Sequence, residues 1–279
     1  MKKIPALSSL PVRAASGAVY AGLVTGALLW SEYSAAIVFC FFIILMCHEF
    51  LGIFAPTASR TGSIMSRLAA LSLPVAGFIS AKTAGQWPVM FVPLLLTISL
   101  PVIYMITDRK FEPRQALALM VPTLYFGLPL WLAIDMSFTP DAMGYATYSA
   151  YPVLYIFVLI WAYDSFAYLT GCTFGKTRLF PSVSPKKSVE GLVGGVVLTL
   201  LLSVGASFIF DIISLRDALV LPLLVSIFGT FGDLLASWLK RSAEIKDFGN
   251  IMPGHGGMLD RLDSILYILP WVWAYYSLF

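Results

Sequence analysis

The sequence predicts an all-α fold: a polytopic transmembrane helical bundle of about nine spans with its N-terminus in the cytoplasm. The mean hydropathy is +0.85, and only 12% of the residues are charged, whereas an ordinary soluble domain has roughly 25%. Apolar runs long enough to cross a hydrocarbon core of about 30 Å, roughly 20 helical residues each, recur along the chain. Lipid-exposed backbone must satisfy its own hydrogen bonds, so we expect these runs to be helices.

The apolar runs divide the chain into its expected parts. The predicted spans cover residues 14–30, 34–54, 66–84, 87–106, 115–134, 151–171, 190–212, 217–237 and 261–279. We expect a single integral membrane domain, residues 1–279, with spans one to five in residues 1–150. Residues 151–279 then carry spans six to nine and the cytoplasmic loops of a catalytic half. No small-residue cleavage site follows the first apolar segment, so we expect that segment to be retained as a span.

The distribution of Lys and Arg predicts the orientation of the bundle. With the N-terminus inside, only Lys82 and Arg216 of the 18 Lys and Arg residues lie outside. Such an excess of positive charge on one side is typical of cytoplasmic loops, and an odd number of spans puts the C-terminus on the far side. The net charge of +3 is therefore mainly topological, and we expect no nucleic-acid partner. The predicted location is the inner (cytoplasmic) membrane.

Several polar side chains lie inside the predicted spans, where they are costly and hence candidates for function. In the predicted orientation the candidates lie toward the cytoplasmic side: His48, Glu49, Asp164 and Asp233 inside spans, and Asp260 and Asp263 at the opening of the ninth. A water-filled cavity open to the cytoplasm would account for this convergence. Asp135 and Asp211 fall at outer span ends, where a solvated cap is the expected role. For Glu49 beside His48, a structural pair at the interface is an equally good explanation.

Asp233 is the strongest single candidate among these residues. It lies in the stretch GTFGDLLASWLKR, with Ser237, Lys240 and Arg241 at offsets of four, seven and eight residues. Those offsets put the four side chains on one face of a helix. A solvated helix end would account for the two cations, but it would not account for a carboxylate aligned beneath them.

A second basic cluster lies between the sixth and seventh spans. Lys186 and Lys187 stand between a Ser-Pro turn and the start of the next helix at Ser188–Glu190. The backbone amides of a helix start favour an anion. The two lysines are therefore candidate phosphate ligands, whereas Lys176 and Arg178 are also explained by topology alone.

These clusters favour chemistry on phosphates at the membrane surface. Carboxylates suit Mg²⁺, which prefers one or two of them together with substrate phosphate oxygens, and the cations suit a nucleotide. The second substrate would be a lipid, because a site built from spans is open to the bilayer. A secondary transporter would place its carboxylates near the midplane within inverted repeats. A zinc hydrolase would need more His and Cys ligands than this chain supplies.

The stretch from Ser237 to Asp263 carries a resemblance to a known family. Its elements are Ser237-x-x-Lys240-Arg241, Lys246-Asp247-x-Gly249, Pro253-x-His255-Gly256-Gly257 and Asp260-Arg261-x-Asp263. In order and spacing they resemble the C-terminal motif of the phosphatidate cytidylyltransferases, or CDP-diacylglycerol synthases. The resemblance extends residue by residue over roughly the second half of the chain, and to the first half by topology only. Met252 and Ser188 depart from the residues that are usual in this family, but neither difference changes charge or hydrogen-bond donor capacity.

The resemblance implies transfer of a cytidylyl group from CTP to phosphatidic acid, which gives CDP-diacylglycerol and pyrophosphate. Mg²⁺, with a second metal ion of open identity, would be held by Asp233 and Asp260, and the expected catalytic residues are Asp233, Asp260 and Asp263. The expected substrate-binding residues are Asp164, Lys186, Lys187, Ser237, Lys240, Arg241, Lys246, His255, Gly256, Gly257 and Arg261. For His255 a structural role in the turn is the alternative.

The expected partners are CTP, phosphatidic acid and membrane lipid, and a homodimer stays open. A CTP-dependent lipid kinase of the polyprenol type is the nearest rival enzyme, because it would transfer the γ-phosphoryl group of the same nucleotide. The transporter is the rival from another class of protein.

Overall fold

The computed structural model describes residues 10–82, 91–107, 112–140, 146–181, 183–254 and 256–278. Helices dominate this part of the chain, and short antiparallel strand pairs accompany them. The chain divides into two compact units. The first comprises Met1–Ala150 with Ile245–Leu262, and the second comprises Tyr151–Glu244 with Asp263–Phe279.

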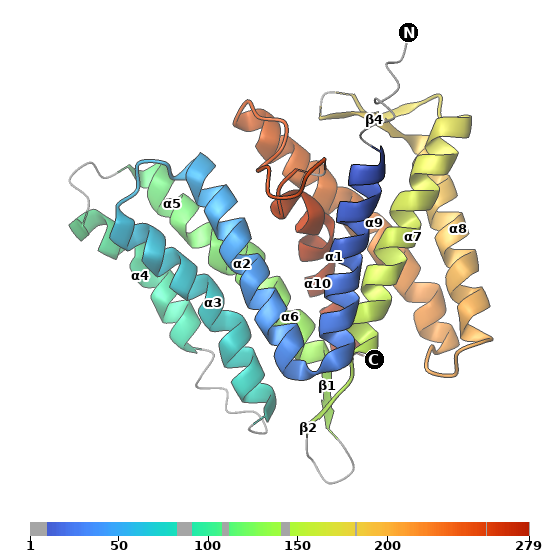
Figure 1. Cartoon of the computed structure of the whole chain (residues 1–279), viewed down its shortest axis with the longest axis horizontal. Coiled ribbons are helices and arrows are strands. Elements are labelled where there is room, and N and C mark those ends of the chain that lie inside the picture. Colours follow the sequence, from blue (N-terminus) through green and yellow to red (C-terminus); the bar gives the residue numbers. More distant parts are fainter. Residues whose placement is uncertain are drawn as a thin grey trace. The chain divides into compact units, whose positions relative to one another are not determined.

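The first unit is built from helices that follow one another closely along the chain (Figure 1). They are α1 (Leu10–Trp30), α2 (Glu32–Phe54), α3 (Arg60–Lys82), α4 (Phe91–Thr107), α5 (Pro113–Val121), the π-helical turn η3 (Pro122–Gly127) and α6 (Leu128–Met136). Strands β1 (Phe138–Pro140) and β2 (Ala146–Tyr148) pair antiparallel after them. A capping box at Ser31 starts α2, because the Ser31 hydroxyl accepts from the Ser34 amide at 3.1 Å and the Ser34 hydroxyl accepts from the Ser31 amide at 3.0 Å.

Small residues let α3 pack closely on η3 and α6. A Cβ at Gly127 would lie 2.5 Å from the Ala70 carbonyl oxygen, and a Cβ at Gly77 would overlap the Trp131 ring. Glycine at these positions is typical of helices that approach each other within a membrane. Phe42, Ile43 and Met46 of α2 are fully buried in the same unit.

The second unit consists of helices and one strand pair, which connects α7 to α8. Its elements are α7 (Tyr151–Phe174), β3 (Arg178–Phe180), β4 (Ser184–Ser188), α8 (Val189–Ser207), α9 (Leu215–Ser242) and all but the first turn of α10 (Leu259–Leu278). Helices α7, α8 and α9 contact one another (Figure 1). A Cβ at Gly194 would lie 2.6 Å from the Thr170 side chain, so α7 and α8 also pack through glycine. Phe228 of α9 stacks on Trp271 of α10 with ring centroids 4.2 Å apart.

Every predicted span overlaps a helix of the structure, and within the described residues six helical segments are long and apolar enough to cross a membrane. These six are α2, α3, the continuous segment Pro113–Met136, α7, α8 and α9. The apolar parts of α1 and α4 are shorter, and α10 carries Asp260, Arg261 and Asp263 in its first five positions. The helical membrane fold is thus confirmed in its coarse form. The count of nine spans and the cytoplasmic N-terminus stay predictions.

The two antiparallel strand pairs were not expected from the sequence. The pair β3–β4 occupies the loop for which only a Ser-Pro turn was predicted, and it carries Lys186 and Lys187 on β4. Both pairs are short, so the all-helical prediction needs only this local correction.

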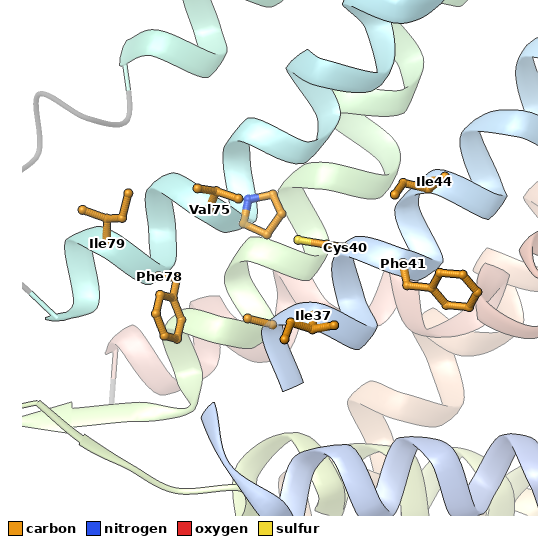
Figure 2. A pocket seen from close by; sticks show the side chains of 9 residues that line it. Ile37, Cys40, Phe41, Ile44, Val75, Phe78 and Ile79 are labelled. Atoms are coloured by element: carbon orange, nitrogen blue, oxygen red, sulfur yellow. The ribbon is translucent and has the colours of Figure 1, made fainter. Parts of the chain in front are cut away.

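An apolar groove of about 440 Å³ lies between α2 and α3 of the first unit. Figure 2 shows Ile37, Phe41 and Ile44 of α2 and Phe78 of α3 around it. No carboxylate, amine or guanidinium group lines this groove. It therefore lacks the groups that bind phosphate or a metal ion, and the candidate reaction site has to be sought among the polar clusters.

Candidate active site

The strand pair β3–β4 brings a lysine to the acidic residue of α9. The Nζ atom of Lys187 lies 2.5 Å from the Oδ2 atom of Asp233, and the two side chains are 31% and 30% exposed. The structure thus joins a predicted phosphate ligand to a predicted metal ligand. We refer to Lys187, Asp233, Asp164 and Tyr163 as the Lys187–Asp233 cluster.

The surroundings of Lys187 favour its charged form. Burial alone would lower the pKa of the Lys187 ammonium group, but the Asp233 carboxylate raises it, and Tyr163 and Asp164 act in the same direction. The net result is a raised pKa, so the ammonium group stays protonated at neutral pH. The Tyr163 hydroxyl is held by a hydrogen bond of 2.6 Å to the Thr230 hydroxyl on α9. The cluster therefore places the protonated Lys187 ammonium group directly against the Asp233 carboxylate.

A carboxylate at the start of α8 anchors the strand pair that carries Lys187. Glu190 accepts hydrogen bonds from the backbone amides of Lys176 at 3.0 Å and of Thr177 at 3.1 Å. The Ser188 hydroxyl caps the same helix by accepting from the Gly191 amide at 3.1 Å. Here we expected helix-start amides to bind an external anion, but the protein's own Ser188 hydroxyl binds one of them.

The remaining basic and polar candidates of the second unit lie on or beside these elements. Lys186 on β4 and Arg241 near the end of α9 are exposed, and Ser237 is half-buried. Lys240 is only 9% exposed. Helix α9 continues to Ser242, so the predicted common face of Asp233, Ser237, Lys240 and Arg241 lies on an unbroken helix.

In the first unit, the Gly-rich loop (residues 245–254 and 256–258) contacts Asp260. The Oδ2 atom of Asp260 accepts from the Phe248 and Gly257 amides, each at 2.9 Å. Gly256 adopts φ +86°, and a Cβ there would lie 2.8 Å from the same oxygen. We expected the loop glycines to bring backbone close to phosphate, but the anion that they meet in the structure is the Asp260 carboxylate. That Gly256 and Gly257 bind substrate stays a prediction.

A second carboxylate, that of Glu49, binds the beginning of α10; the sequence marked Glu49 as a candidate for function but did not predict this contact. Glu49 of α2 accepts from the Met258 amide at 2.8 Å through Oε1 and from the Leu259 amide at 2.9 Å through Oε2. Glu49 is buried, at 6% exposure, whereas its neighbour His48 is exposed. No ion pair joins these two residues in the described part of the chain. The only sequence signal was an acidic residue within an apolar helix.

Asp263 is buried in the second unit, at 6% exposure. Its Oδ1 atom accepts from the Ser264 amide at 2.7 Å. Its backbone carbonyl packs against α9, where a Cβ at Gly232 would lie 2.8 Å from the carbonyl oxygen. Asp260 and Asp263 stand three residues apart on α10 and share one face of that helix.

Three further site predictions concern exposed or undescribed residues. Lys246 and Arg261 are exposed. His255 lies outside the described residues, so its predicted contact with substrate stays a prediction. Among the described residues, no group of three or more His, Cys, Asp or Glu side chains could hold a metal ion. A metal site here would therefore rely on one or two carboxylates and on substrate phosphates, which is the pattern that Mg²⁺ prefers.

The fold and these clusters define an integral membrane protein with sites suited to anionic substrates. The model of the cytidylyltransferase family matches residues 11–279. A phosphatidate cytidylyltransferase from Bacillus subtilis is 36% identical over 208 residues, which are 67% of this chain and 77% of that relative. One from Thermotoga maritima is 38% identical over 186 residues, which are 63% of this chain and 65% of that relative. One from Staphylococcus haemolyticus is 41% identical over 119 residues, which are 42% of this chain and 46% of that relative.

The chain therefore belongs to the cytidylyltransferase family, and it is a nucleotidyltransferase enzyme. The resemblance inferred from the C-terminal motif is confirmed, and the match reaches far into the half of the chain that had been assigned by topology alone.

Proposed function

We propose that this enzyme is a CTP:phosphatidate cytidylyltransferase, which converts CTP and phosphatidic acid to CDP-diacylglycerol and pyrophosphate in phospholipid biosynthesis. The relatives named above carry this activity in their names. The observation that carries the proposal within this chain is the Lys187–Asp233 pair, because it sets a fixed cation and a carboxylate side by side at the end of an apolar helix bundle.

The reaction needs neutralisation of charge more than it needs a base. An oxygen of the lipid phosphate attacks the α-phosphorus of CTP, and the bond from that phosphorus to the oxygen bridging to the β-phosphate breaks. The lipid phosphate is already an anion, so no strong base has to remove a proton, and repulsion between two anions dominates the barrier. We propose that Lys186, Lys187, Lys240, Arg241 and Arg261 bind the phosphates and reduce this repulsion.

The acidic residues suit a divalent cation. We propose that Asp233 and Asp260 hold Mg²⁺, with a second metal ion and Asp263 contributing to the same site. Oxygen ligands from carboxylates fit Mg²⁺, and the Asp233 carboxylate already faces a positive charge, that of Lys187. Bound metal would supply charge neutralisation on the departing pyrophosphate. The chain's own contribution is to fix the two carboxylates, and backbone amides do this for Asp260.

The proposed setting is the inner membrane, with the site open to the cytoplasm. The positive-inside distribution of Lys and Arg supports this orientation, since a cytoplasmic site would be accessible to a soluble nucleotide. Phosphatidic acid would reach it from the bilayer. No nucleic-acid partner is proposed, and a homodimer stays open.

The test uses purified protein in detergent with phosphatidic acid, Mg²⁺ and either α-³²P-CTP or γ-³²P-CTP. We expect label from the α-position to enter the lipid and label from the γ-position to leave as pyrophosphate. Label from the γ-position in the lipid would identify a kinase instead. Solute flux in reconstituted vesicles without consumption of CTP would identify a transporter, and either result would overturn the proposal.

A further inference from the structure

We propose that Glu49 is a positioning residue for the reaction, because it sets the first turn of α10 and thereby the Asp260 carboxylate. This inference rests on the proposed function. Glu49 belongs to α2, yet both of its carboxylate oxygens are bound by backbone amides 209 and 210 residues later in the chain. It does not touch substrate in this proposal, and it acts through Asp260.

The contact satisfies amides that α10 cannot satisfy itself. The first N–H groups of a helix have no partner within the helix, and Met258 and Leu259 occupy this position at α10. A buried carboxylate is the strongest acceptor available there, because its charge also interacts favourably with the helix dipole. Glu49 therefore fixes the backbone on which the next residue, Asp260, stands.

The same backbone supplies the donors that orient Asp260. One of its two amide donors is Gly257, which directly precedes the residues bound by Glu49. The other is Phe248, within the same Gly-rich loop. A shift of the Met258–Leu259 backbone would move both Asp260 and its Gly257 donor, so the orientation of Asp260 depends on Glu49.

The Gly-rich loop is shaped to the Glu49 side chain at two glycines. A Cβ at Gly249 would lie 2.5 Å from Oε1 of Glu49, and a Cβ at Gly257 would lie 2.6 Å from both carboxylate oxygens. For each of these glycines the three nearest atoms all belong to Glu49. Gly52, three residues further along α2, has nothing within 4 Å of the corresponding Cβ position and provides a matched control.

The first experiment measures turnover and its dependence on Mg²⁺ concentration for Glu49→Gln and Glu49→Asp. Glutamine keeps the size of the side chain but sets an NH₂ donor against a backbone N–H donor. We expect kcat to fall by about 10 to 100-fold in Glu49→Gln, as for other residues that orient metal ligands, and the Mg²⁺ concentration for half-maximal activity to rise by a similar factor. Glu49→Asp keeps two acceptor oxygens and should recover part of both losses.

The second experiment measures thermal unfolding in detergent and does not depend on activity. Gly249→Ala should lower the melting temperature in the wild-type background, because the new methyl group displaces Glu49. In a Glu49→Ala background the atoms that it would meet are gone, so the added cost should largely disappear. Gly52→Ala should leave the melting temperature close to that of the wild type in both backgrounds.

The outcomes separate three explanations. Wild-type kcat and wild-type Mg²⁺ dependence in Glu49→Gln would overturn the proposal. So would a lower melting temperature with an unchanged Mg²⁺ dependence, because a purely structural cap predicts that combination. Additive effects of Gly249→Ala and Glu49→Ala would refute the contact itself. If the wild type released no pyrophosphate from CTP and phosphatidic acid, the proposed function would fail, while the unfolding experiment would still test the contact.

Discussion

Asp233 stands next to a lysine ammonium group, and this contact decides what its removal should do. Asp233→Asn would leave Lys187 without the carboxylate that raises its pKa, and it would remove a proposed metal ligand. We expect turnover to fall on the order of 100-fold, the size typical of losing one such group at a reaction centre. The side chain is 30% exposed, so the protein should still fold in detergent.

The measurement is release of pyrophosphate together with a melting curve for the same preparation. Asp211→Asn is the control, because Asp211 is an exposed carboxylate in the turn between α8 and α9. Full activity in Asp233→Asn would remove Asp233 from the proposed site.

The backbone conformation of Gly256 leads to a second prediction, which concerns the substitution Gly256→Ala. Its φ of +86° is unfavourable for any residue with a Cβ, and that Cβ would meet Asp260 at 2.8 Å. Gly256→Ala should therefore cost roughly 1 to 3 kcal/mol locally and displace the Asp260 carboxylate. We expect a loss of turnover in the same assay, whereas Gly22→Ala should retain it, because nothing lies within 4 Å of a Cβ at Gly22. Equal activity in the two variants would contradict this view of the loop.

Among the elements, the contact between α7 and α8 depends on glycine. A Cβ at Gly191 would lie 2.8 Å from the Ala167 carbonyl oxygen and 3.1 Å from the Gly171 Cα atom. Gly191→Leu should separate the helices at an expected cost of roughly 1 to 3 kcal/mol. A lower melting temperature in detergent would report it. Gly205→Leu, on the same helix but with open space around its Cβ position, should melt close to the wild type.

The sequence alone predicted most of the helices but not the strand pair β3–β4. The length of the apolar runs predicted the positions of the helices, and the offsets after Asp233 predicted a common face that lies on one unbroken helix. The pair β3–β4 escaped prediction because Ser184–Ser188 is short, polar and contains a proline, so neither strand nor helix periodicity marks it. The sequence did predict Lys187 as a candidate ligand, although it did not predict the strand that carries this residue.

The contacts of Glu49 and of the loop glycines escaped prediction for a different reason. The partners of Glu49 are backbone amides, and no residue type or spacing reveals a side chain that will bind backbone so far along the chain. The glycines signalled a close approach to an anion, but sequence could not tell a bound phosphate from a carboxylate of the protein. The Glu49 contact joins residues 209 and 210 positions apart, which local patterns do not encode. Asp260 lies only three residues from Gly257, so there the error was in the identity of the anion.

At the scale of the whole molecule, the distribution of Lys and Arg predicts the orientation in the membrane. We predict that position 216 faces outward and that position 246 faces the cytoplasm. The native cysteines would first be replaced, since Cys172 is exposed. A membrane-impermeant maleimide should then label Arg216→Cys in intact cells and Lys246→Cys only after permeabilisation. The reverse pattern would invert the proposed topology and move the site to the other side of the membrane.

The bond between Glu49 and the start of α10 also sets an order of events during synthesis. The carboxylate leaves the ribosome 209 residues before its first amide partner, a delay of roughly 10 to 40 s at ordinary translation rates. During that interval α2 has to be accommodated in the bilayer with its carboxylate still lacking these amides. Chains that stop before residue 258 never supply them, so the nascent protein completes this centre only after Met258 and Leu259 have been translated.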